Sequence, residues 1–326
     1  WLVEQYGSVA RAEQVWKCAA NRQNGKVTGP LDDQLLTSSD KDLMVAAYRR
    51  FADDLISRRY REVIRLVRTV DDTHLVGART GYGGTGSLWA VPAYPFQVTS
   101  GAAHLDFISP EGYGYSSVNY TDAILVGQYC RWAGNGKPVF WAEFGSSLWP
   151  YDLGGEKAAD QNRLYDGFAR MLLKSGANGL AAWWNVGGYR VDERSDFGCI
   201  APDGTPRASA RTLQAHAAAV TAQREPPPVR RLVEVIRDEH ALAYEAIYHL
   251  YKETFVETAA KEGMVEVRTP GTGTTSATVP LTVVGQLPFD SFAPLCYINA
   301  EFYWVRVLDA AGTWREVPRN GEVRVK

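Results

Sequence analysis

The sequence predicts an α/β fold built on a parallel sheet, followed by a small β-rich α+β domain. Short apolar runs alternate with amphipathic stretches of helical length through the first 224 residues. The runs are apolar at successive positions, which is typical of strands that helices cover on both faces. Three consecutive prolines, Pro226 to Pro228, then interrupt the alternation and favour an extended linker.

Four apolar runs are the predicted strands of the sheet. They begin 30, 33 and 42 residues apart and comprise Leu75–Ala78, Leu105–Ile108, Pro138–Ala142 and Leu180–Trp184. Helical periodicity predicts helices around them at Ser39–Val70, Thr121–Trp132, Glu156–Ser175 and Pro206–Gln223. The first forty residues are predicted to be irregular, apart from a short helix near Val9–Ala19.

The number of strands limits the architecture. A TIM (β/α)8 barrel needs eight such units and about 250 residues, whereas residues 1–224 supply four strands. We therefore expect either a smaller open sheet or the last four units of an incomplete barrel. Beyond the prolines, a helix is predicted at Asp238–Gly263 and strands at Met264–Arg268, Ala277–Val284, Tyr297–Leu308 and Trp314–Val325. The predicted domains are residues 1–224 and 225–326.

The charge balance disfavours nucleic acid or an anionic membrane as a partner. The 326 residues carry 35 Lys and Arg against 37 Asp and Glu, a formal net charge of −2, with no dominant block of either sign. No run of eighteen or more apolar residues predicts a membrane-spanning helix. The chain opens at Trp1 without a signal peptide, so we expect its true N-terminus to lie further upstream.

The cysteines predict neither a metal site nor a disulfide framework. They are widely spaced, without a Cys-x-x-Cys pair or a close Cys/His group, and are interpreted as isolated thiols. The four positions are Cys18, Cys130, Cys199 and Cys296.

Two carboxylates and a tyrosine follow neighbouring predicted strands, at the edge where parallel α/β folds place functional side chains. The third run delivers Glu143 from an otherwise apolar strand, where a charge is costly unless it is paired or used. We interpret Glu143 as a catalytic carboxylate, with a structural ion pair as the alternative. Tyr113, after the second run, is expected to donate a hydrogen bond to it. Three interpretations of Glu111 remain open: it is a catalytic acid/base, it binds sugar hydroxyls, or it is a charged residue of the loop.

Aromatic and polar residues at the same edge favour a carbohydrate ligand. The chain holds 10 Trp and 17 Tyr, and flat amphipathic rings suit the faces of sugars. We expect either Trp183 or Trp184 to face the cleft, because adjacent strand residues point to opposite sides. Arg79 is predicted to pair a carboxylate or to bind substrate oxygens. Asn185 and Trp149, on the loops after the fourth and third runs, are further predicted substrate-binding residues.

Three of these strand ends resemble segments of clan A glycoside hydrolases, the retaining (β/α)8 glycosidases that include family 5 cellulases and mannanases. Lys137–Gly145 is similar to their seventh-strand motif and Asp106–Tyr113 to their sixth strand. Ala182–Trp184, followed by Asp196–Ile200 and Asp203–Arg207, resembles the eighth strand and its exit loop. The segments occur in the family's order, and the resemblance covers about residues 1–220.

The resemblance implies that Glu143 is the nucleophile of a retaining glycosidase, that Tyr113 hydrogen-bonds it, and that Trp183 or Trp184 is the floor of the sugar subsite. Such enzymes use two carboxyl groups about 5 Å apart. The family's acid/base glutamate lies in an Asn-Glu pair, and no such pair occurs in this sequence. Because Trp1–Ser8 resembles the region after that pair, we expect the proton donor upstream of this chain. No metal or organic cofactor is implied.

The leading hypothesis is retaining hydrolysis of a β-linked oligo- or polysaccharide, a substrate class that favours an exported protein. The alternative is a catalytically inactive carbohydrate-binding protein that keeps the aromatic cleft. A third hypothesis pairs Glu111 with Glu143 as catalytic carboxyl groups within this chain. Half a barrel would expose open sheet edges, so we expect poor solubility or self-association if this chain is expressed alone.

Overall fold

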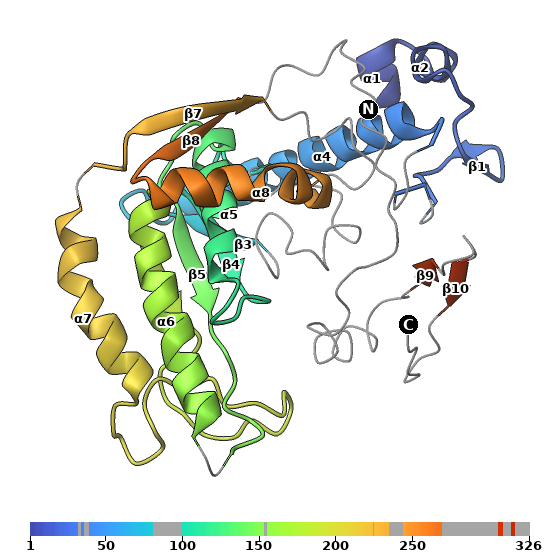
Figure 1. Cartoon of the computed structure of the whole chain (residues 1–326). Helices are drawn as coiled ribbons and strands as arrows, with labels where there is room; N and C mark the ends of the chain where they lie inside the picture. Colours follow the sequence, from blue (N-terminus) through green and yellow to red (C-terminus); the bar gives the residue numbers. More distant parts are fainter. Residues whose placement is uncertain are drawn as a thin grey trace. The chain divides into compact units, whose positions relative to one another are not determined.

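The computed structural model in Figure 1 describes most of the first 268 residues and two short strands near the C-terminus. The described residues are 1–31, 34–35, 39–80, 100–152, 155–223, 225–234, 244–268, 306–308 and 314–316. The chain divides into two compact units, residues 1–277 and 278–326. Every residue predicted to form the site belongs to the first unit.

A small helical region precedes the sheet. It contains α1 (Leu2–Tyr6), α2 (Val9–Trp16), the hairpin of β1 (Arg22–Gln23) and β2 (Lys26–Val27), and the long helix α4 (Asp42–Arg68). The short and long predicted helices are confirmed as α2 and α4. Trp16 of α2 and Met44 of α4 belong to one buried apolar cluster, which joins the two helices.

Four parallel strands form the predicted sheet, in the order β3-β4-β5-β6. They are β3 (Gly77–Thr80), β4 (Phe107–Gly112), β5 (Phe140–Phe144) and β6 (Gly179–Ala182). Each overlaps one predicted apolar run. The register sets Arg79 beside Ser109 and Glu111 beside Glu143, so the candidate residues lie along one edge.

Helices α5 (Ala123–Ala133), α6 (Glu156–Ser175) and α7 (Ala208–Ala222) follow the strands as predicted, and Figure 1 shows α6 between β5 and α7. The ring of Phe144, at the end of β5, stacks on Phe168 of α6 with centroids 4.6 Å apart and planes at 8°. Gly112 permits this contact, because a Cβ there would lie 2.6 Å from Cζ of Phe168. The strand that carries Glu143 is therefore packed tightly on α6.

The segment after the prolines packs on the same unit. Strands β7 (Val229–Glu234) and β8 (Met264–Arg268) pair in parallel, and α8 (Tyr244–Ala260) lies between them in the chain. Nε1 of Trp132 in α5 donates to the carbonyl of Val265 at 2.7 Å, and the amide of Val265 donates to Oε1 of Gln128 at 2.9 Å. The division between the two units thus does not coincide with the predicted boundary at residue 225, because β8 is bonded to α5.

The predicted strand at Met264–Arg268 is confirmed, whereas β7 is a strand that the sequence pattern did not indicate. In the second unit, β9 (Arg306–Leu308) and β10 (Trp314–Glu316) pair antiparallel inside two predicted strands. The strand predicted at Ala277–Val284 lies outside the described residues.

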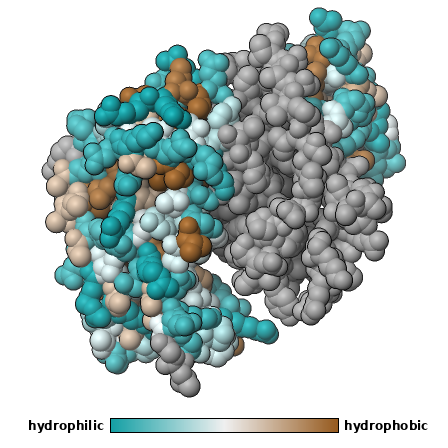
Figure 2. All heavy atoms as spheres, in the orientation of Figure 1, coloured by the Kyte–Doolittle hydropathy of each residue, from teal (hydrophilic) through white to brown (hydrophobic). Residues whose placement is uncertain are grey.

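Hydrophilic residues cover most of the described surface on the face in Figure 2, and hydrophobic residues appear there as separate patches. Within the described ranges, no helix is long and apolar enough to cross a bilayer.

Candidate active site

Glu143 lies near the end of the buried strand β5, and its side chain is held by two neighbours. It is 9% exposed. Oη of Tyr113 donates a hydrogen bond to Oε2 of Glu143 at 3.0 Å, as the sequence predicted. Burial of the Tyr113 phenol, reinforced by the adjacent Glu143 charge, raises the pKa of Tyr113 far above its usual value. The phenol therefore remains a hydrogen-bond donor to this carboxylate throughout the physiological pH range.

Arg79 contacts both carboxylates of the site. Its Nε lies 2.7 Å from Oε1 of Glu111, and its Nη1 donates to Oε1 of Glu143. The Arg79 side chain is 57% exposed although both partners are buried. The alternative interpretation of Glu143 was a structural ion pair, and such a pair with Arg79 is present. It lies at the carboxyl edge of the sheet, where the nucleophile was expected.

Glu111 is the most buried of these charged groups, at 2% exposure. Burial raises the pKa of Glu111 to about 7, with a further increase from the charge of Glu143 and an opposing decrease from Arg79. Its ion-pair partner is Arg79, whose Nε lies 2.7 Å from Oε1 of Glu111.

Trp183 and Trp184 follow β6, which ends at Ala182, so the strand is shorter than predicted. The expectation that only one of the two rings faces the cleft assumed that both residues lie on the strand. Because both lie beyond it, the alternation of strand residues cannot decide which ring faces the cleft. The two residues are joined by a cis peptide bond, their ring centroids lie 5.5 Å apart, and both are partly buried. The ring centroid of Phe197 lies 5.9 Å from that of Trp184 and 6.0 Å from that of Tyr113. Phe197 therefore connects the Trp pair to Tyr113, the hydrogen-bond donor to Glu143.

Trp149 belongs to an exposed ring cluster on the loops after β5 and β6. It is 39% exposed, and its ring centroid lies 4.4 Å from Tyr189 and 5.4 Å from Tyr151. Asn185 is exposed on the second of these loops, where its carbonyl accepts a hydrogen bond from the amide of Ile200. The structure thus places both predicted residues at the carboxyl end of the sheet, on surfaces open to solvent.

Sequence reasoning missed a buried ion pair within the loop after β6, whose carboxylate also bonds to the loop after β5. Asp196 is fully buried and bonds to Nη1 and Nη2 of Arg207 at 3.0 and 2.8 Å, while Oη of Tyr151 donates to it at 2.8 Å. Burial opposes ionisation of Asp196, but the bonds from Arg207, Tyr151 and backbone amides prevail and lower its pKa to about 2. Both residues stand in the segments that resemble the eighth exit loop, yet nothing in their spacing indicated the pair.

The guanidinium of Arg190 lies close to both rings of the Trp pair. Its guanidinium carbon lies 4.9 Å from the ring centroid of Trp184 and 6.0 Å from that of Trp183. It also pairs with Asp192 at 2.8 Å and Glu193 at 3.1 Å. These acidic residues consequently neutralise a cation that stacks on the rings.

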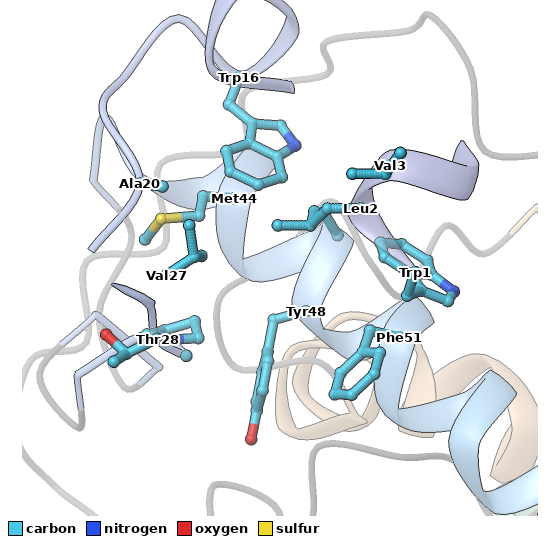
Figure 3. Close-up of a pocket in the computed structure, with 13 residues that line it drawn as sticks. Trp1, Leu2, Val3, Trp16, Ala20, Val27, Thr28, Met44, Tyr48 and Phe51 are labelled. Atoms are coloured by element: carbon cyan, nitrogen blue, oxygen red, sulfur yellow. The ribbon is translucent and has the colours of Figure 1, made fainter. Parts of the chain in front are cut away.

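A separate apolar cavity of about 370 Å³ lies among the N-terminal helices. Figure 3 shows Trp16, Tyr48 and Phe51 around it, and no carboxylate lines it. Among the described residues, no group of three His, Cys, Asp or Glu side chains is arranged to hold a metal ion. The titratable cluster of Arg79, Glu111, Tyr113 and Glu143 is therefore the candidate active site.

No protein-family model matches this sequence, and no curated protein sequence matches it. Solved structures do resemble it. A β-galactosidase from the Antarctic haloarchaeon Halorubrum lacusprofundi matches with a TM-score of 0.58 and 15% identity, over 83% of this chain and 43% of its own. The cold-adapted β-galactosidase from Rahnella sp. R3 matches with a TM-score of 0.58 and 13% identity, over 82% and 41%. GH5_18 from Streptomyces cattleya, in complex with GlcNAc, matches with a TM-score of 0.48 and 12% identity, over 72% and 68%.

The likeness to the β-galactosidases shows the fold, an α/β chain with a parallel sheet. This chain spans less than half the length of the two β-galactosidases that it matches.

Proposed function

We propose that this chain supplies the nucleophile and part of the sugar-binding surface of a retaining β-glycosidase. The observation that carries the proposal is the Glu143 carboxylate, which lies near the carboxyl end of a buried parallel strand with one oxygen bonded to Tyr113 and the other to Arg79. Two donors on two oxygens fix the plane of the carboxylate, and such preorganisation is what a nucleophile requires.

In the proposed reaction, a Glu143 oxygen attacks the anomeric carbon of a β-linked sugar. The bond to the leaving oxygen breaks as that oxygen receives a proton from a carboxylic acid, and a glycosyl ester forms on Glu143. Water, deprotonated by the same carboxyl group, then attacks the anomeric carbon and releases Glu143. The Tyr113 phenol and the Arg79 guanidinium hold the nucleophile in place through both steps.

The proton donor is proposed to be a glutamate outside these 326 residues. Glu111 is the carboxyl group nearest to Glu143 in the sheet register, yet it is buried and bonded to Arg79. A general acid must reach the leaving oxygen of the substrate, and the proposal favours a donor outside this chain because Glu111 is the more buried of the two carboxylates.

The proposed substrate is a β-linked oligo- or polysaccharide. The Trp pair connects to Tyr113 through Phe197, and Trp149 lies exposed on the adjoining loop. Rings arranged in this way suit several sugar faces. Because two of the similar structures are named β-galactosidases, β-galactosides are the first compounds to test, followed by β-glucosides and β-mannosides.

A second candidate function, non-catalytic saccharide binding, is favoured by one observation. The sequence contains no Asn-Glu pair, which is where the resembling family carries its acid/base residue. In that case the aromatic surface would bind sugars and Glu143 would serve only as an ion-pair partner of Arg79.

Covalent labelling distinguishes the two functions. 2,4-Dinitrophenyl 2-deoxy-2-fluoro-β-glycosides need no proton donor, because dinitrophenolate leaves unprotonated, and they trap the glycosyl ester. We expect intact-mass spectrometry to show one added fluoroglycosyl group, located on Glu143 by peptide mapping. Glu143→Gln should abolish labelling, whereas Glu62→Gln, an exposed residue of α4, should not change it. Saccharide binding by calorimetry without labelling by any of the three sugars would establish the binding function instead.

A further inference from the structure

Three charged residues of the site share one face of the sheet because of the register of their strands. Glu111 of β4 lies beside Glu143 of β5, and Arg79 of β3 lies beside Ser109, two residues before Glu111. Residues two apart on a strand point to the same side. The long Arg79 side chain therefore starts on the same face as both carboxylates and extends past β4 to reach Glu143 of β5.

The guanidinium joins the two carboxylates in a fixed geometry. Arg79 uses Nε toward Glu111, at 2.7 Å, and Nη1 toward Glu143. Because the guanidinium is planar, a partner on Nε determines the direction in which Nη1 donates. Glu111 is immobilised by burial, whereas the Arg79 side chain is more than half exposed. An exposed arginine without an anchor would populate many rotamers.

We infer that Glu111 is a positioning residue, which accepts the Nε–H of Arg79 and so aims the guanidinium that holds Glu143. The inference rests on the proposed function, since it assigns Glu111 a part in orienting the proposed nucleophile. It also explains why a carboxyl group is buried one strand away from Glu143.

The role depends on a hydrogen-bond acceptor at residue 111 more than on its charge. Among the described residues, the ion pairs and the hydrogen bond of this site join Arg79, Glu111, Tyr113 and Glu143, and the Tyr165 phenol also lies close enough to act on Tyr113. Burial raises the pKa of Glu111 to about 7, so the group is partly protonated at neutral pH. A protonated carboxyl still offers its carbonyl oxygen to Nε–H. A glutamine at this position would offer the same acceptor, whereas a leucine of similar size would not.

The test compares Glu111→Gln with Glu111→Leu in the full chain. The first measurement is the rate of Glu143 labelling by the dinitrophenyl fluoroglycosides. We expect Glu111→Gln to retain the rate within about threefold and Glu111→Leu to lower it at least tenfold, with both variants folded by circular dichroism. Asp106→Asn, which removes the negative charge that pairs with Arg68 directly before the same strand, is the matched control and should keep the wild-type rate.

The second measurement does not depend on catalysis. The Nε–H of Arg79, assigned by its loss in Arg79→Lys, is observed by ¹⁵N NMR. We expect a signal protected from solvent exchange in the wild type and in Glu111→Gln, and its loss in Glu111→Leu. The inference is overturned if both variants label like the wild type, if both are equally slow, or if the signal persists in Glu111→Leu. If the wild type is not labelled at all, the proposed function fails, and the NMR signal alone decides the role of Glu111.

Discussion

Asp196 and Arg207 form a two-bonded ion pair within the loop after β6, and Asp196 also bonds to Tyr151 on the loop after β5. The Asp196 carboxylate has no exposed surface, and its backbone also bonds to Ser147 and Leu148 on the β5 loop. The ring cluster around Trp149 is therefore carried by loops with a rigid internal connection, rather than by two independent segments.

Replacing Asp196 by asparagine should destabilise the first unit. The change leaves Arg207 partly buried without its counter-charge, and breaking a buried pair in this way costs about 3–5 kcal/mol. Urea unfolding followed by tryptophan fluorescence measures the loss. Asp192→Asn, which removes an exposed partner of Arg190, should cost at most about 1 kcal/mol. Equal effects of the two substitutions would contradict the structural role of Asp196.

The raised pKa of Glu111 predicts that part of the folding free energy is lost as pH increases. The folded state binds this proton more tightly than the unfolded state, whose carboxyl has its ordinary pKa of 4.5, so the contribution is complete below pH 4.5 and disappears as pH rises to about 7. The change amounts to about 3 kcal/mol by linkage. Between pH 4.5 and pH 7.5, the wild type should therefore lose more stability than Glu111→Gln in urea titrations. Parallel pH profiles for the two proteins would refute this assignment.

Removal of the exposed ring of Trp149 should weaken saccharide binding without unfolding the chain. Trp149→Ala loses a flat surface of the kind that stacks on sugars, and an effect of about 1.4 kcal/mol corresponds to a tenfold higher Kd. Calorimetry with β-linked oligosaccharides measures the change. Leu66→Ala, an exposed apolar residue of α4, is the control and should leave Kd unaltered. Unchanged binding by Trp149→Ala would exclude this ring from the saccharide surface.

Gly112→Ala should destabilise the sheet beside Glu143. The added methyl carbon would lie 2.6 Å from Cζ of Phe168 and 2.7 Å from Cβ of Phe144, so one of two buried, stacked residues must move. Overpacking of this kind costs about 1–3 kcal/mol. Thermal unfolding detects the loss. Because Phe144 follows Glu143 directly, the rate of fluoroglycoside labelling should fall as well, and an unaltered melting temperature would disprove the packing argument.

The sequence predicted the part of the fold that depends on local pattern. Apolar runs and helical periodicity located the four parallel strands and the helices after them, because burial on both faces leaves a continuous apolar signal. The bond from Tyr113 to Glu143 was also anticipated, since parallel strands bring their carboxyl ends together. The division between the two compact units, after residue 277, was not anticipated. The prolines lead directly into β7, which pairs with β8, and the bonds from β8 to α5 join residues about 130 positions apart, so no local pattern indicated them.

Pairings between distant charged residues were equally invisible in the sequence. Nothing in the spacing of Arg79, Glu111 and Glu143 specifies that one guanidinium contacts both carboxylates, and Asp196 with Arg207 gave no signal as a pair. Such contacts depend on strand register and loop path rather than on periodicity. The Trp pair illustrates the same limit, since β6 ends before the residues to which alternation was applied.

The bonds of β8 to Trp132 and Gln128 determine where this polypeptide can be shortened. Phe255, Ala259 and Val265 are buried in the same apolar cluster as α5. A chain that ended at the proline segment would expose to solvent the surface of α5 that β8 and α8 cover. It would also leave Nε1 of Trp132 and Oε1 of Gln128 without their backbone partners. We therefore expect a minimal version of the sheet to extend through Arg268, because β8 completes the packing around α5.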